Sequence, residues 1–172
     1  MALVIKATSG AVDANSYCTL AESDAYHESR LHTDSWDDAD DDTKNRALAS
    51  ATRLLDSHIT WDGYPASEAQ ALQWPRTALY DSFDNLIDEA TIPQVLKNAT
   101  AEFALHLIDD DLVANVSSEG IEGVGLGPIK VDFSATGQKR NVIPDIVLEM
   151  LDLWIYDTPF RASGCSVRFV RS

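Results

Sequence analysis

The chain has 172 residues, enough for one domain with a sizeable core, and its 45% hydrophobic content excludes an intrinsically disordered protein. Its 28 acidic and 13 basic residues give a formal net charge of −15, which disfavours tight nucleic-acid binding over a broad surface. No stretch approaches the roughly 18 apolar residues that a membrane span needs, and we expect no signal peptide because a basic n-region and a long apolar segment are missing at the start.

The first predicted helix starts with a capping box at residues 19–22. In such a box the hydroxyl of Thr19 accepts a hydrogen bond from the amide of Glu22, whose carboxylate reaches back to the amide of Thr19. We expect a helix of about three turns through Leu31. Leu20, Ala25 and Leu31 are its candidate inward residues.

Residues 34–42 hold six aspartates and Trp36. A calcium-binding EF-hand loop begun at Asp38 fails, because Thr43 stands where Gly is required and Ala49 where Glu is required. We therefore expect an acidic loop whose last aspartates cap the next helix. The candidates for an acidic surface are Asp37, Asp38, Asp40, Asp41 and Asp42.

The next helix is predicted from Thr43 to Ile59, because apolar residues recur every three or four positions. Arg53 and Asp56 lie on its other face with the spacing of a solvated surface pair. The apolar stripe consists of Ala47, Leu48, Ala51, Leu54, Leu55 and Ile59.

A stiff, apolar segment at residues 70–76 follows, which we call the strap. Trp74 offers a large apolar surface, Pro75 restricts the backbone, and Arg76 adds a rigid fork of donors. We interpret the strap as a structural element pinned in the core by Trp74, with no chemistry of its own. Its structural residues are Gln70, Leu72, Trp74, Pro75 and Arg76.

The second strongly periodic helix is predicted from Ile92–Pro93 to about Asp110, with Thr91 as its cap. Its C-terminal end carries Asp109, Asp110 and Asp111, which oppose the helix dipole and form a second candidate acidic surface.

The remaining elements are a β-hairpin at about 119–134 and a last helix from Pro144 to about Ile155. Residues 157–172 differ in charge: they carry +2 on a body of −17. We therefore expect two regions, a domain at 1–156 and a C-terminal docking tail at 157–172, although the tail could instead lie along its own acidic body. The candidate docking residues are Arg161, Val167, Arg168, Phe169 and Arg171.

The predicted fold class is mainly α: a small bundle of about four helices with an inserted β-hairpin and an extended C-terminal tail. No catalytic, nucleotide-binding or metal-binding motif is present, so we expect no enzyme, no cofactor and no metal. The distant Cys18 and Cys165 fit either two free thiols in a reducing compartment or one long-range disulfide.

Several stretches taken together resemble a known family. They are residues 14–20, 51–56, 61–63, 70–76 and 92–102. The resemblance that they carry spans about residues 14–155, most of the chain. In this order and spacing they resemble the DnaT-like single-stranded-DNA-binding proteins of tailed bacteriophages, and they are also similar to head–tail connector, or adaptor, proteins of long-tailed phages.

The two parts of the resemblance imply different functions. An adaptor forms a ring, commonly a dodecamer, under the portal protein in the virion neck, where it extends the DNA channel without specific DNA binding and supports a tail-side connector or stopper protein. Its C-terminal segment docks into the portal. A DnaT-like replication accessory needs basic grooves and stacking aromatics. Because this body is acidic and its aromatic residues lie in apolar patterns, we expect the adaptor, with the replication accessory as the alternative and a metal-dependent enzyme using residues 34–42 as a third hypothesis.

Overall fold

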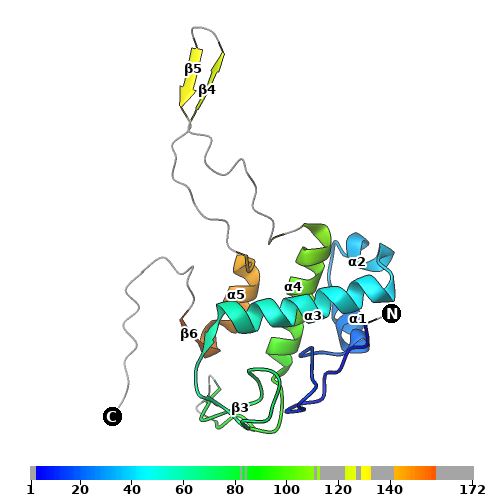
Figure 1. The fold of residues 1–172 in the computed structure, drawn as a ribbon, viewed down its shortest axis with the longest axis vertical. Helices are drawn as coiled ribbons and strands as arrows, with labels where there is room; N and C mark the ends of the chain where they lie inside the picture. Colours follow the sequence, from blue (N-terminus) through cyan, green and yellow to red (C-terminus); the bar gives the residue numbers. More distant parts are fainter. Residues whose placement is uncertain are drawn as a thin grey trace.

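Helix α4, Gln94–Asp109, is the element against which most of the other helices pack in the computed structural model (Figure 1). The structure describes residues 3–81, 83, 85–110, 112, 123–126, 129–132 and 142–157. In this part of the chain, α4 contacts α1 (Leu20–His27), α2 (Asp34–Asp38), α3 (Asp41–His58) and α5 (Asp145–Leu151). Small and apolar side chains such as Ala99, Phe103 and Ala104 are completely buried on α4, which allows the close approach of its neighbours.

Helix α3 forms where the sequence predicts it, because capping and amphipathicity agree there. The side chain of Asp40 accepts a hydrogen bond of 2.8 Å from the amide of Thr43, which confirms that the acidic run caps this helix. All six residues of the predicted apolar stripe are buried. They contribute to a single core with Trp36, Trp61, Trp74 and the buried face of α4.

Short strands connect distant parts of the chain rather than building a large sheet. Strand β1 (Thr60–Trp61) pairs antiparallel with β6 (Ile155–Asp157), and β2 (Tyr64–Pro65) pairs antiparallel with β3 (Arg76–Thr77). The predicted hairpin is confirmed as β4 (Gly123–Leu126) paired with β5 (Ile129–Asp132). The described chain is therefore mainly helical with a small inserted hairpin, as the sequence predicts.

The prediction for the first helix is right at its start and wrong at its end. The capping box of Thr19 and Glu22 is present, but α1 ends at His27 instead of Leu31. Leu31 is 80% exposed, and the buried residues of α1 are Ser23 and His27. The helix turns a polar face inward because the ring of His27 packs against Trp36, with ring centroids 4.4 Å apart.

Two further predictions are corrected. Residues 34–38 are helix α2 instead of a loop, and they place Trp36 in the core, where its indole N–H donates to Asp24. Thr91 is not the cap of α4, since Pro93 holds the N-cap position and makes no side-chain cap bond.

Helix α5 is shorter than predicted, because the chain continues as a 3-10 turn, η1 (Asp152–Trp154), and then as β6. Helices α4 and α5 pack directly against each other although the hairpin is inserted between them in the sequence. Figure 1 shows that the chain leaves α4 and enters α5 at the same end of the domain. None of the helices in the described part of the chain combines the length and apolar character that a membrane span requires.

Candidate functional site

Trp74 lies in the core at 1% exposure. Its ring meets that of Trp61 edge to face, with centroids 5.7 Å apart and an interplanar angle of 89°. This is a favoured geometry for aromatic pairs, which are stabilised by about 0.5–1.5 kcal/mol beyond their burial. The pair fixes the strap to the end of α3, because Trp61 follows that helix by three residues.

Arg76 is buried and acts as a hydrogen-bond centre for the surrounding loops. Its guanidinium donates to the backbone carbonyls of Asp62 at 2.7 Å, Gly63 at 2.8 Å and Gln73 at 3.0 Å. Burial lowers the pKa of Arg76, and the charges of Tyr17, Asp56 and Asp62 oppose this shift only in part. Since its donors are directed inward, Arg76 is no candidate for binding an external anion.

The other strap residues also serve the loop itself. The amide of the Gln70 side chain donates to the carbonyl oxygens of Leu72 at 2.7 Å and Pro75 at 3.1 Å. Pro75 is buried and is joined to Trp74 by a cis peptide bond. The side chains of Gln70 and Arg76 thus bind backbone carbonyls of the strap and of the loop after α3, which supports a structural role for the strap.

The surface pair predicted between Arg53 and Asp56 is wrong. Asp56 instead accepts a hydrogen bond from the hydroxyl of Tyr17 and a second, of 3.1 Å, from the amide of Gln73. Burial raises the pKa of Asp56, against the effect of these hydrogen bonds. The partners lie far away in the sequence, so local spacing gave no signal of them.

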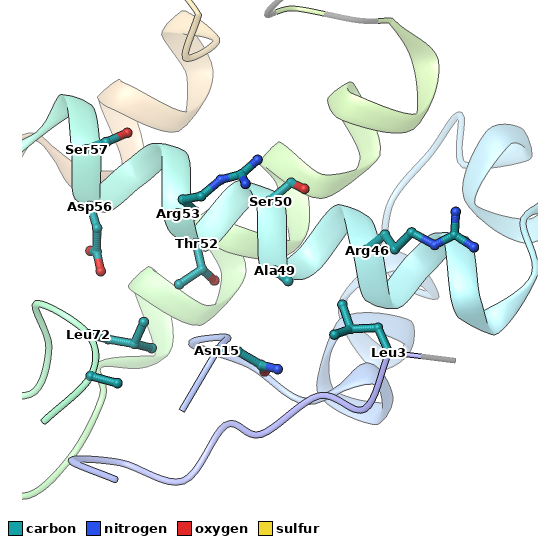
Figure 2. Close-up of a pocket in the computed structure, with 11 residues that line it drawn as sticks. Leu3, Asn15, Arg46, Ala49, Ser50, Thr52, Arg53, Asp56, Ser57 and Leu72 are labelled. Carbon is teal, nitrogen blue, oxygen red and sulfur yellow. The ribbon is translucent and has the colours of Figure 1, made fainter. Parts of the chain in front are cut away.

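Arg53 is consequently left on the surface of α3 without a partner among the described residues. Arg46, Ser50 and Arg53 lie three or four residues apart, on one face of the helix, and we call them the α3 ridge. A groove of about 650 Å³ runs along one side of this ridge, between α3, the N-terminal segment at Leu3 and the strap at Leu72 (Figure 2). Residues of the ridge also line a second hollow, whose far wall is Leu107 and Ile108 of α4.

Most other basic groups whose side chains are described are already neutralised. In the part of the chain whose side chains are described, five basic residues pair with carboxylates. The pairs are Lys6 with Asp13, Arg30 with Glu102, Lys44 with Asp24, Arg46 with Asp42, and Lys97 with Glu22. With Arg76 buried, Arg53 is the cation in this part of the molecule that is most available to an external anion.

The two acidic runs lie at one end of the domain. Helix α2 packs against α4, and Figure 1 shows it near the C-terminal end of that helix, where Asp109 and Asp110 are exposed. Asp37, Asp38 and Asp41 are exposed as well, whereas Asp40 caps α3 and Asp42 pairs with Arg46. Asp111 lies outside the described residues. Among the residues described, no group of three or more His, Cys, Asp or Glu side chains is arranged to hold a metal ion.

The sequence analysis missed a group of exposed aromatic rings. Tyr64, Tyr80 and Phe83 are 72%, 57% and 83% exposed, although aromatic residues were expected in apolar patterns. Their neighbours in the sequence include Pro65, Asp81 and Asn85, which are typical of turns and mark this region as loop. Residue type alone favours burial of aromatic rings, so the turn-forming residues around them were the sequence feature that could have predicted their exposure.

The predicted docking residues Arg161, Val167, Arg168, Phe169 and Arg171 lie outside the described residues. Docking of the tail therefore stays a prediction. So does the state of Cys165, while Cys18 is a buried free thiol.

Fold and surface together define a small, acidic, mainly helical domain, and among its described residues the most available cation, Arg53, lies on a grooved helix face. The chain belongs to the family described as "Putative DnaT-like ssDNA binding protein", whose model matches residues 1–172. This confirms the family part of the resemblance and gives no support to its head–tail adaptor part. The searches of curated proteins and of solved structures found no match.

Proposed function

We propose that this protein is a DnaT-like accessory that contacts single-stranded DNA through the α3 ridge. The observation that carries the proposal is Arg53, an exposed guanidinium left without a partner in the described part of the chain, on a grooved face of a protein that belongs to a family described as ssDNA-binding. The match to this family favours the replication accessory over the adaptor that the sequence analysis preferred.

The chemistry of the ridge suits a phosphodiester. The planar guanidinium of Arg53 can donate two parallel hydrogen bonds to phosphate oxygens. The hydroxyl of Ser50 lies one turn away and can donate to the same or the next phosphate. The adjoining groove of about 650 Å³ has the size of a small-molecule site, which is about 300–1,000 Å³.

The charge balance makes this contact weak. Arg46 already shares its charge with Asp42, so the ridge neutralises few phosphates. Each neutralised phosphate of a single strand contributes about −0.7 to the slope of log K against log salt. We therefore expect weak binding with a slope on the order of −1.

The test is fluorescence anisotropy of labelled single-stranded oligonucleotides over a range of salt concentrations. The Arg53→Glu variant should bind much more weakly than wild type. The matched control is Lys97→Glu, which makes the same change in net charge at a paired position that lines neither hollow beside the ridge. Equal binding by wild type and Arg53→Glu, or no binding by wild type at low salt, would refute the role of the ridge.

A second candidate function is the head–tail adaptor, and two observations favour it. Five described basic groups are paired within the chain, and both acidic runs lie at one end of the domain. In a ring below the portal, such an end would keep the DNA backbone from adhering to the channel. This proposal includes the virion neck as the location, and the portal protein and a tail-side protein as partners.

Mass photometry and electron microscopy of the chain, alone and with portal protein, test this second candidate. Rings together with absent DNA binding would favour the adaptor. A submicromolar dissociation constant for single-stranded DNA with a steep salt dependence would exclude it and favour the replication accessory.

A further inference from the structure

The described residues between 80 and 86 hold three large apolar side chains in solvent. Tyr80 and Leu86 are paired across an antiparallel bridge, and Phe83 lies at the turn between them. Their side chains are 57%, 66% and 83% exposed. Side chains of partners in an antiparallel pair lie on the same side, so Tyr80 and Leu86 present one continuous apolar surface.

The loop is fixed at its base and at its turn. The amide of Ile87 donates to the carbonyl of Leu79 at 2.9 Å, and Leu79 itself is buried. The carboxylate of Asp81 accepts from the amides of Phe83 at 2.8 Å and Asn85 at 2.9 Å, as in an Asx-turn. Because the backbone is held in this way, the exposed rings cannot simply fold back into the core.

The surroundings of the loop are acidic. Between Arg76 and Lys97 the chain has no basic residue. It has four acidic ones, Asp81, Asp84, Asp88 and Glu89, and of these Asp88 and Glu89 are exposed. An apolar surface with an acidic rim fits a partner segment that is both apolar and basic.

The C-terminal segment of this chain has that composition. Residues 158–172 contain three arginines and no acidic residue, together with Phe160, Val167, Phe169 and Val170. The arginines are Arg161, Arg168 and Arg171. Aromatic residues and arginines are the types most enriched at the centre of protein interfaces.

The last described residue before this segment lies in the same region as the loop. Asp157 pairs with Thr60 in the β1–β6 ladder. Gly63 lies three residues after Thr60 in the sequence. It packs closely on the segment before the loop, because a Cβ added to Gly63 would lie 2.3 Å from the carbonyl oxygen of Thr77 and 3.0 Å from the side chain of Leu79. Leu79 directly precedes Tyr80. Fifteen residues extend over at most about 50 Å, so residues 158–172 can reach the loop. Figure 1 shows β6 at the same end of the domain as the loops around β3.

We propose that residues 158–172 dock on the apolar surface formed by Tyr80, Phe83 and Leu86. The arginines of the segment face the acidic rim, and its phenylalanines cover the exposed rings. This inference is independent of DNA binding at the α3 ridge, and it assigns the tail to its own body instead of a portal protein. Docking of the segment on a second copy would use the same surface, and the test below distinguishes it from docking within one chain.

The experiment uses the full chain and its own Cys165, which lies in the docking segment. A Phe83→Cys variant is oxidised with oxidised glutathione, and formation of a disulfide with Cys165 is followed by mass spectrometry. The control is Leu31→Cys, because Leu31 is as exposed, at 80%, but lies at the end of the domain formed by α1 and α2. Cys18 is buried and does not compete.

We expect the disulfide to form at least about tenfold faster in Phe83→Cys than in Leu31→Cys, because docking raises the effective concentration of the two thiols. A linked monomer on a non-reducing gel supports docking within one chain, whereas a linked dimer would overturn it and assign the surface to a second copy. Equal rates in the two variants would overturn the proposal.

Hydrogen exchange provides a second measurement that needs no new cysteine. Amides of residues 158–172 should exchange more slowly in wild type than in a Phe83→Asp variant, since a charge on the apolar surface opposes docking. The matched control Leu31→Asp should leave the exchange of this segment unchanged. Fast exchange of the segment in wild type would also overturn the proposal.

Discussion

Replacing Trp74 by alanine tests the role of the strap most directly. The side chain is 1% exposed and packs edge to face on Trp61, so its removal takes away a large buried surface and an aromatic pair. The strap also contains Arg76, whose donors bind the carbonyls of the loop after α3. Those contacts remain in the variant, so the change isolates the contribution of the ring.

The expected loss of stability follows from this burial. Truncation of a buried Trp or Phe to Ala costs about 3–5 kcal/mol, which includes the cavity that remains. A domain of this size has a total stability of about 5–15 kcal/mol. Because 1 kcal/mol shifts the melting temperature of such a chain by about 2–4 °C, we expect a decrease of roughly 6–20 °C.

The assay is urea unfolding followed by far-ultraviolet circular dichroism, together with a thermal melt. The matched control is Tyr64→Ala, which removes an aromatic ring that is 72% exposed in the neighbouring strand β2. This control should change the free energy of unfolding by no more than about 0.5 kcal/mol. A Trp74→Ala melt within a degree or two of wild type would refute a core role for Trp74 and indicate an interface instead.

Three further predictions concern capping and buried polar groups. Asp40→Ala should lower the free energy of unfolding by about 1 kcal/mol through loss of the α3 cap, as measured by urea unfolding, and an unchanged midpoint would contradict it. Although burial works to raise it, the pKa of Glu102 lies below its ordinary value because of the hydrogen bonds and charge of Arg30. A carboxyl group whose pKa is lowered in the folded state stabilises the fold at pH values above its unfolded pKa of 4.5. This stabilisation is lost as the pH falls through the folded pKa. Melts of Glu102→Gln should therefore fall furthest below wild type at neutral pH and approach it in acid, and a constant difference would be inconsistent with this coupling. Tyr17→Phe leaves the half-buried carboxylate of Asp56 without one donor, so urea unfolding should show a loss of about 1–3 kcal/mol, and an unchanged stability would show that water replaces the hydroxyl.

The sequence predicted elements in which local and tertiary preferences agree. Helix α3 has a cap, an apolar stripe and good length, and every residue of the stripe is buried. The hairpin was predictable because its apolar residues alternate around a turn rich in glycine. Helix α2 has only five residues, too few to show a period, so its composition resembled that of a loop.

The sequence was least informative where long-range contacts decide. His27 is buried because it packs on Trp36, which no local pattern of α1 indicates. Asp56 binds Tyr17 from a distant segment instead of the nearby Arg53, and this distant contact leaves Arg53 exposed. The candidate DNA contact was therefore not predictable from the spacing of charges along α3.

The insertion between α4 and α5 has a consequence for how this chain can change over evolution. The two helices pack on each other, and the intervening segment leaves and re-enters the core at the same end. The entropy of closing a loop increases only slowly with its length, by about 0.6 kcal/mol for each doubling. The segment that carries β4 and β5 can therefore lengthen, shorten or exchange its sequence at little cost in stability while the helical core stays intact.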